Sequence, residues 1–190
     1  TESGYLLKAS IKDSTAIEIL PISFKGQKLK RLIKDNSGNI WCATNTGIKE
    51  ITASFLMHIP LAAPYKLGEI SAITCDRDNT IWYAQGKQLY NIDKKGKQQK
   101  QFMASVAISS LYADRNGNIW IGTLGEGVYY RNNKGQVAKV NTLTPLRNES
   151  VLDITGTDDK IWVAGLHGVE EFTYPTAGIS SMRLVKLHNK

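Results

Sequence analysis

The side chains of this sequence that could carry out metal or acid–base chemistry are few, and they do not recur at matching positions. The three histidines, His58, His167 and His188, bear no common relation to one another along the chain, so they form no evident set of metal ligands. Asp114 opens a stretch that begins like a calcium-binding loop, but Gly125 stands where such a loop needs its last carboxylate. We therefore predict no metal site, no cofactor and no catalytic residue in this chain.

The two cysteines, Cys42 and Cys75, lie in apolar segments. Two cysteines cannot define a disulfide framework, so small buried thiols are the expected state. A disulfide would require Cα atoms within about 7 Å of each other in an oxidising compartment, and the sequence leaves that alternative open.

Every tryptophan stands in the same four-residue frame, in which Ile precedes the ring and Ala or Gly follows two positions later. The four copies are Ile40-Trp41-Cys42-Ala43, Ile81-Trp82-Tyr83-Ala84, Ile119-Trp120-Ile121-Gly122 and Ile161-Trp162-Val163-Ala164. They recur at intervals of 41, 38 and 42 residues. A period of about 40 residues built from short apolar strands is typical of repeat proteins, in which a small sheet stacks on copies of itself.

Residues that favour turns flank each tryptophan. Asp35, Asp76 and Asp114 stand six residues before their tryptophans, in strings rich in Asn, Asp and Gly. These strings predict tight turns between strands, because Asp and Asn bond their own backbone and Gly readily takes positive φ. The fourth copy, residues 157–160, lacks the glycine and predicts a turn one residue shorter. A second turn, a third strand and a weaker fourth strand follow in each copy.

Four strands per repeat at this period predict an all-β fold, the β-propeller with four-stranded antiparallel blades. The expected blades span approximately residues 29–68, 69–107, 108–148 and 149–190 of one domain, 1–190. Residues 5–24 look like the two outer strands of a further blade, so residues 1–28 form a predicted partial blade. The total is about four and a half blades, which we interpret as a fragment of a larger propeller. A complete five-bladed ring with an atypical first blade is the alternative.

The tryptophans are expected to be structural. A large ring on the second strand of each blade would fill the space between neighbouring sheets. The Ala or Gly two positions later lies on the same strand face and is expected to leave room for the ring. Aromatic platforms that stack a sugar are the alternative, and they would need these rings to be exposed.

Composition is that of an ordinary soluble domain, with 42% hydrophobic and 22% charged residues. The formal net charge of +7 suits a partner with negative character, such as a uronate-containing or sulfated sugar. The densest basic cluster, residues 94–100, falls on a predicted turn, where solvation alone accounts for it. Nucleic-acid binding is not predicted, because no aromatic residues are interleaved with the basic ones and no known module is present.

The stretch from Asp114 to Val128 resembles the two-component regulator propeller repeat. The signature of that family reads Asp-x-x-Gly-Asn, then Ile-Trp-Ile-Gly-Thr and a pair of glycines before Leu or Val, and here only Glu126 interrupts the glycine pair. The stretch from Asp35 to Ile48 is a good second match, while the other two copies diverge. The resemblance covers about residues 29–172.

This resemblance implies a periplasmic sensor region of a membrane-bound histidine kinase, such as a hybrid two-component system that controls polysaccharide use. We therefore expect a non-catalytic segment that binds an oligosaccharide or related breakdown product and relays occupancy to a kinase domain outside this chain. Contact with the membrane would come only through other parts of the parent protein.

Two alternatives stay open, because propeller folds host many activities. One is a propeller enzyme of the metal-assisted lyase type, with a histidine and a divalent ion in the central channel. It would need convergent histidine and carboxylate groups near the axis, where the inner strands offer only Asp153. The other is a protein-binding scaffold.

Blade geometry predicts where a ligand would bind. Loops that join the second strand to the third, and loops that join one blade to the next, emerge on the same face of a propeller. The predicted ligand-binding residues on that face are Asn45, Glu126 and His167 from the first set of loops, and Tyr65, Lys66 and Arg147 from the second. Tyr65 could stack on a sugar ring, and Arg147 could pair with a carboxylate.

An incomplete propeller leaves strand edges unpaired, and unpaired edges recruit strands from other molecules. We therefore expect this chain to self-associate into dimers or larger oligomers. Light scattering of the purified chain measures this directly, and a monomer at all accessible concentrations would contradict the expectation.

Overall fold

The computed structural model describes residues 5–9, 17–24, 26–52, 56–59, 69–93, 95–142 and 146–188. Nearly all of its regular structure is β-strand, in four four-stranded sheets and one two-stranded sheet, all antiparallel. Two short 3-10 turns, η1 (Val140–Thr142) and η2 (Ile179–Ser181), complete it. Among the described residues no helix is long and apolar enough to span a membrane.

Each four-stranded sheet is a meander, in which the strands pair in chain order. The first sheet contains β3 (Leu29–Lys34), β4 (Ile40–Thr44), β5 (Gly47–Ile51) and β6 (Leu56–Ile59). The second contains β7 (Ile70–Cys75), β8 (Ile81–Gln85), β9 (Gln88–Ile92) and β10 (Gln98–Met103). The third contains β11 (Ile108–Ala113), β12 (Ile119–Thr123), β13 (Val128–Arg131) and β14 (Val137–Lys139). The fourth contains β15 (Val151–Gly156), β16 (Lys160–Gly165), β17 (Gly168–Thr173) and β18 (Leu184–His188).

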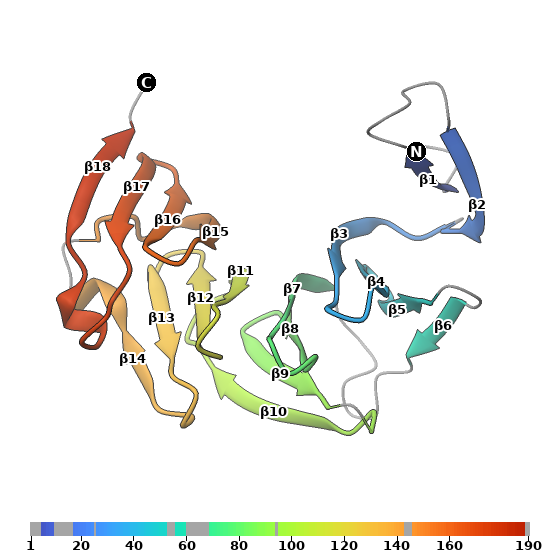
Figure 1. Ribbon diagram of the computed structural model, residues 1–190, viewed down its shortest axis with the longest axis horizontal. Coiled ribbons are helices and arrows are strands. Elements are labelled where there is room, and N and C mark those ends of the chain that lie inside the picture. The colour runs from blue at the N-terminus through green and yellow to red at the C-terminus, as the bar shows by residue number, and fades with distance from the viewer. Residues whose placement is uncertain are drawn as a thin grey trace.

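The four sheets stand side by side around an open arc, with their first strands toward the centre and their fourth strands at the rim (Figure 1). Consecutive first strands contact one another, β3 with β7, β7 with β11 and β11 with β15. The two-stranded sheet, β1 (Tyr5–Ala9) and β2 (Ile17–Ser23), lies beyond the first sheet at one end of the arc (Figure 1). This arrangement confirms the predicted all-β propeller fold.

Each second strand of the inner sheets packs against two neighbours. Trp82 and Ala84 share a hydrophobic core with Leu111 of the third sheet, whereas Tyr83 shares a different core with Trp41 of the first sheet. Alternate side chains of a strand point to opposite faces, so β8 contributes to both cores. Apolar residues in unbroken succession on this strand therefore reflect burial on both sides.

The same contact joins each pair of neighbouring sheets. On one sheet, the tryptophan and the small residue two positions later form one side of the contact. Two apolar residues, three positions apart on the first strand of the next sheet, form the other side. The three sets are Trp41 and Ala43 with Ile70 and Ile73, Trp82 and Ala84 with Ile108 and Leu111, and Trp120 and Gly122 with Val151 and Ile154. The first three tryptophans are at most 7% exposed, which confirms their structural role.

The small residue of the frame makes room for the neighbouring sheet. A Cβ atom added to Gly122 would lie 2.6 Å from Cγ1 of Val151 and 3.3 Å from Cδ1 of Ile154, both on β15. At this position the nearest atoms belong to the next blade, so the small residue leaves room for the neighbouring sheet.

The aspartates before the first three tryptophans organise the first turns and bond the indole rings. In each case Oδ1 accepts the backbone N–H groups two and four residues further on, at 2.9–3.0 Å. Oδ2 of Asp35, Asp76 and Asp114 accepts the indole N–H of the tryptophan six residues later, at 3.0, 2.8 and 3.0 Å. One carboxylate thus satisfies both the turn and a buried indole, which explains the six-residue spacing.

Two other turns contain the backbone hydrogen bonds of this motif without the bond to an indole ring. Asp93 and Asn132 accept the same two backbone N–H groups in the turns before β10 and β14, but no tryptophan follows at the same distance. In the fourth repeat, Thr157 N–H bonds to the carbonyl of Lys160, three residues on, where the other first turns bond four residues on. The predicted shorter turn is therefore confirmed.

Asp114 allows the indole bond to be measured separately from the turn. It also accepts hydrogen bonds from the Tyr174 hydroxyl at 2.8 Å and from the Asn118 side-chain amide at 2.9 Å, so Asp114→Ala removes the acceptor of three buried side-chain donors in addition to the two backbone bonds of the turn. We expect a loss of about 2–4 kcal/mol in the free energy of unfolding. Asp93→Ala, the matched control, removes only the two backbone bonds and should cost about 1 kcal/mol. Chemical denaturation measures both, and equal losses would contradict the indole role.

Gly122→Ala tests the contact between the third and fourth sheets. The added Cβ overlaps Val151, so we expect a loss of about 1–3 kcal/mol in the free energy of unfolding from overpacking. Adding Val151→Ala to Gly122→Ala should cost less than the sum of the two single changes, because it removes the overlapping methyl groups. A Gly122→Ala variant with wild-type stability, or strictly additive losses in denaturant titrations, would count against this packing.

Candidate functional site

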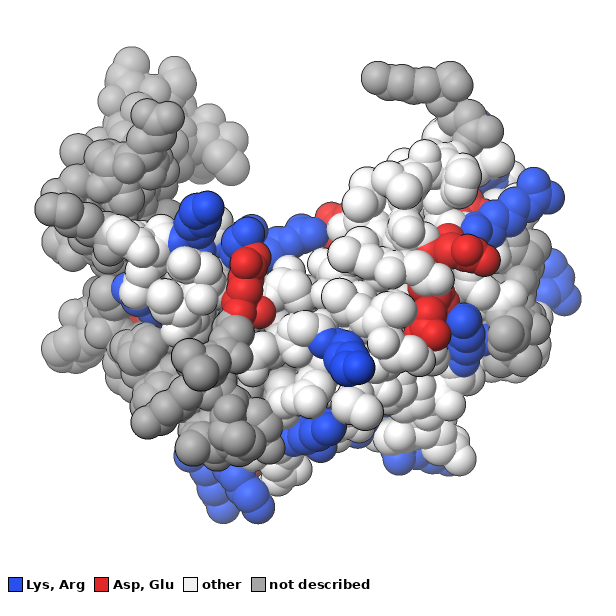
Figure 2. Space-filling model, turned by 180° about the vertical axis from the view of Figure 1, so that it is seen from behind, with Lys and Arg blue, Asp and Glu red and all other residues white. Residues whose placement is uncertain are grey.

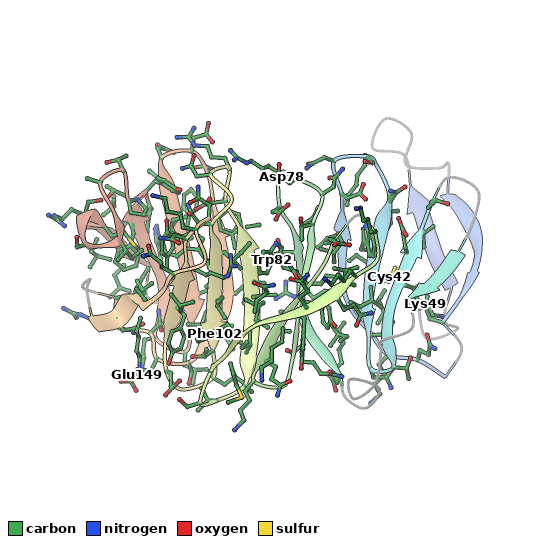
Figure 3. The ribbon with its side chains drawn as sticks, turned by 90° about the horizontal axis from the view of Figure 1, so that it is seen from below. Cys42, Lys49, Asp78, Trp82, Phe102 and Glu149 are labelled. Carbon is green, nitrogen blue, oxygen red and sulfur yellow. The ribbon has the colours of Figure 1, made fainter. Side chains whose placement is uncertain are left out.

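The loops of the arc divide between two faces. Asp78, in a first turn, and Glu149, in the connection between the third and fourth sheets, lie on opposite faces, with Trp82 in the interior between them (Figure 3). The backbone N–H groups of Gly125 and Gly127, in the turn before β13, bond to the carbonyl of Glu149 at 3.0 and 2.7 Å. This second turn and this blade connection therefore share one face, which we call the linker face.

Two of the predicted ligand-binding residues, Tyr65 and Lys66, lie outside the described residues. Asn45 has a local role, since its Oδ1 accepts the backbone N–H of Lys28 at 2.8 Å. Glu126 accepts a hydrogen bond from the Tyr129 hydroxyl at 2.8 Å, which is the main cause that lowers the pKa of its carboxyl group. Glu126 therefore presents a negative charge at this face.

Arg147 and His167 come together at one corner of the linker face through two buried residues that sequence reasoning missed. The Glu170 carboxylate accepts the backbone N–H groups of Arg147 and Asn148, each at 2.9 Å, and the side-chain amide of Asn148 at 2.6 Å. Oδ1 of Asn148 in turn accepts the backbone N–H of His167 at 3.2 Å. The network positions both backbones, while the side chains of Arg147 and His167 remain exposed.

The centre of the arc holds a second group of polar side chains, which we call the axial cluster: Arg31, Ser110 and Asp153. The Arg31 guanidinium lies 3.2 and 3.4 Å from the two carboxylate oxygens of Asp153, and the Ser110 hydroxyl donates to Oδ1 of Asp153 at 2.9 Å. Arg31 is on β3 and Asp153 on β15, so this ion pair joins the first sheet to the fourth. Of the ion pairs among the described residues, it alone connects sheets that are not adjacent.

The residues of the axial cluster occupy one equivalent position in their sheets. Each pairs with the small residue of the tryptophan frame, Arg31 with Ala43, Ser110 with Gly122 and Asp153 with Ala164, and in the second sheet Ala72 pairs with Ala84 in the same way. The strand register shifts immediately before this position in all four sheets. A β-bulge re-aims the side chain beside it, and this position is polar in three of the four sheets, with Ala72 as the exception. The sequence signal is a residue nine or ten positions before tryptophan.

The residues that directly precede Arg31, Ala72 and Ser110 link the first strands of consecutive sheets. Ser71 donates to the carbonyl of Ile108 at 2.7 Å, and Ser109 donates to the carbonyl of Val151 at 2.6 Å. At the equivalent position of the first sheet, Lys30 forms an ion pair with Glu69 at 2.5 Å. These contacts fix the spacing of the strands that carry Arg31 and Asp153.

The ion pair of the axial cluster is accessible, whereas Ser110 is buried beneath it. The side chains of Arg31 and Asp153 are 40% and 53% exposed, so solvent or a ligand can reach the pair. Seen from behind, the space-filling view shows basic side chains beside the opening of the arc (Figure 2). A guanidinium can exchange one carboxylate for another of suitable geometry, which makes this cluster suited to binding an anionic group.

Metal and thiol chemistry find little support in the described part of the chain. No group of three or more His, Cys, Asp or Glu side chains there is arranged to hold a metal ion. Cys42 and Cys75 are both free thiols, and burial is the main cause that raises the pKa of each to about 11. These thiols are therefore poor nucleophiles at neutral pH.

Solved structures that resemble this chain are propellers longer than it. A streptogramin B lyase structure matches with a TM-score of 0.77 and 16% sequence identity, over 98% of this chain and 63% of the lyase chain. Virginiamycin B lyase from Staphylococcus aureus matches with a TM-score of 0.76 and 15% identity, over 97% of this chain and 63% of that one. At such identities the likeness shows the fold alone.

A third similar structure is the extracellular domain of a hybrid two component system from B. thetaiotaomicron. Its TM-score is 0.67 at 20% identity, over 96% of this chain and 27% of that one. The chain thus spans less than two thirds of the length of each of these structures.

Sequence comparison points to the third repeat. No curated protein sequence matches the chain. Residues 103–125, which contain Asp114 and Trp120, match the family model described as two component regulator propeller. The resemblance expected from the tryptophan frame is confirmed over this repeat, and the chain therefore carries a two component regulator propeller repeat within a β-propeller fold.

Proposed function

We propose that this chain is a non-catalytic, ligand-sensing segment of a two-component signalling receptor and that it acts outside the cytoplasm. The observation that carries the proposal is the two component regulator propeller repeat at residues 103–125. The likeness to the extracellular domain of a hybrid two component system supports the same compartment and role. The kinase that would receive the signal lies outside this chain.

The proposed ligand is an acidic oligosaccharide or a breakdown product of one. Its site combines the axial cluster with the linker face. β15 begins directly after the connection that holds Arg147, so Asp153 lies close in sequence to the linker face. Arg31 supplies a guanidinium that a uronate carboxylate can bind through two parallel hydrogen bonds. The net charge of +7 favours the approach of an anion.

The Arg31–Asp153 pair offers a route from binding to signal. It joins the two ends of the arc, so a ligand carboxylate that displaces Asp153 from Arg31 changes the contact between the first and fourth sheets. A ligand can shift a receptor between two states only if it binds one of them more tightly. In this proposal the ligand replaces Asp153 at Arg31, so the ion pair distinguishes the unliganded state from the liganded one.

A metal-assisted lyase is the second candidate function. The observation in its favour is the TM-score of 0.77 to the streptogramin B lyase structure, over 98% of this chain. In that case a divalent ion would bind near the axis, and residues outside this chain would complete its ligand set.

A thermal-shift titration of the full-length protein tests the sensor proposal. Oligogalacturonate should raise the melting temperature, because a ligand at about 100 times its Kd stabilises the folded state by about 2.7 kcal/mol. A neutral oligosaccharide of equal length should have no effect. Arg31→Gln should abolish the shift, whereas Arg115→Gln, which breaks an exposed ion pair with Asp158 in the first turns, should retain it.

Three outcomes would contradict this assignment. Equal shifts with neutral and acidic sugars would remove the role of charge, and a full shift in Arg31→Gln would remove the axial cluster from the site. A response to calcium or magnesium alone, accompanied by cleavage of the sugar, would favour the lyase.

A further inference from the structure

At one end of the arc, the first sheet exposes residues whose equivalents in the other three sheets are buried. In the second, third and fourth sheets, two apolar residues of the first strand enter the tryptophan frame of the preceding sheet. Strand register places Leu29 and Leu32 of β3 in the same positions as Ile70 and Ile73 of β7. Leu29 and Leu32 therefore provide one half of this contact, and a tryptophan frame on a preceding sheet would provide the other half.

Exposure separates these two leucines from their equivalents. Leu29 is 38% exposed and Leu32 is 45% exposed. The six equivalent residues, Ile70, Ile73, Ile108, Leu111, Val151 and Ile154, are at most 8% exposed. Elsewhere on the same sheet, Cys42 and Ile51 are covered by Phe24. The uncovered part of the first sheet is thus the part nearest the axis.

The neighbouring two-stranded sheet has a matching gap. β1 and β2 pair only with each other among the described residues, whereas every other sheet has four strands. β2 lies toward the rim and β1 on the side of the opening (Figure 1). The position beside β1 and against Leu29 and Leu32 corresponds, in strand order, to the first two strands of a sheet. One hairpin would fill it.

We propose that this space is the docking site for a β-hairpin of the same repeat type, supplied by the same polypeptide outside residues 1–190. The three internal contacts define its chemistry. Its second strand carries tryptophan followed two positions later by Ala or Gly, and that face covers Leu29 and Leu32. The same strand pairs with the edge of β1 that has no partner among the described residues, which completes a four-stranded sheet.

The source of the hairpin follows from the space available. A fourth sheet of a second copy is too large, because β1 and β2 already occupy the outer half of this position (Figure 1). The chain also spans only 63% of each lyase structure and 27% of the sensor domain that it resembles, so propellers of this kind extend over more sequence. Docking of the chain's own hairpin would hold the ends of the propeller together.

Photo-crosslinking in the full-length protein tests the proposal. A photoreactive phenylalanine derivative replaces Leu32, and mass spectrometry maps its product. We expect a crosslink within one polypeptide, to a segment outside residues 1–190 that contains the tryptophan frame. A crosslink between two polypeptides, a crosslink within residues 1–190 or no crosslink would overturn the proposal.

Thermal denaturation of full-length variants gives an independent measurement. Leu32→Asp should lower the melting temperature about as much as Ile73→Asp, its buried equivalent, because both place a carboxylate in a closed apolar contact. The control, Leu166→Asp, changes a loop residue that is 73% exposed and should leave the melting temperature unchanged. If Leu32→Asp behaves like Leu166→Asp, then Leu32 is exposed in the whole protein and the proposal fails.

Discussion

Burial of one tryptophan between neighbouring sheets is the interaction on which this structure depends. A sheet of four short strands cannot bury both of its faces alone, so each sheet needs the next one. The ring supplies the largest apolar surface of that contact, but it carries an N–H group that must be bonded once it is buried. The carboxylate of Asp35, Asp76 or Asp114 provides the acceptor and orders the adjoining turn at the same time.

The fourth repeat departs from this pattern where the enclosing sheet is not present among the described residues. Trp162 is half-buried, and its turn lacks the aspartate. Opposite it on β17, Glu171 forms ion pairs with Lys160 at 2.6 Å and His188 at 3.1 Å, and the Lys160 bond is the main cause that lowers the pKa of Glu171 to about 2. The Trp162 indole also donates a hydrogen bond to Glu171, so a carboxylate on β17 takes the place of the missing turn aspartate.

The contact between sheets also determines what lies at the axis. It brings the inner strands close enough for Ser71 and Ser109 to bond to the next strand, and the bulge beside them directs Arg31 and Asp153 toward each other. Surface ion pairs contribute little stability, about 0–1 kcal/mol, so breaking this half-exposed pair costs the fold little. In the proposed function the buried tryptophan frame is structural, while the exposed Arg31–Asp153 pair binds the ligand.

The sequence by itself determined the repeat, the strand order, the turns and the propeller fold, because these follow from local residue preferences recurring at a fixed period. It also indicated the shorter fourth turn. Only the tertiary structure decided that Asp114 accepts the Trp120 indole and that Arg31 meets Asp153 across the arc. Arg31 and Asp153 are 122 residues apart, and their contact depends on how strongly the bulges and the packing of intervening sheets bend the arc. That curvature arises from side-chain packing between sheets, which no local pattern encodes.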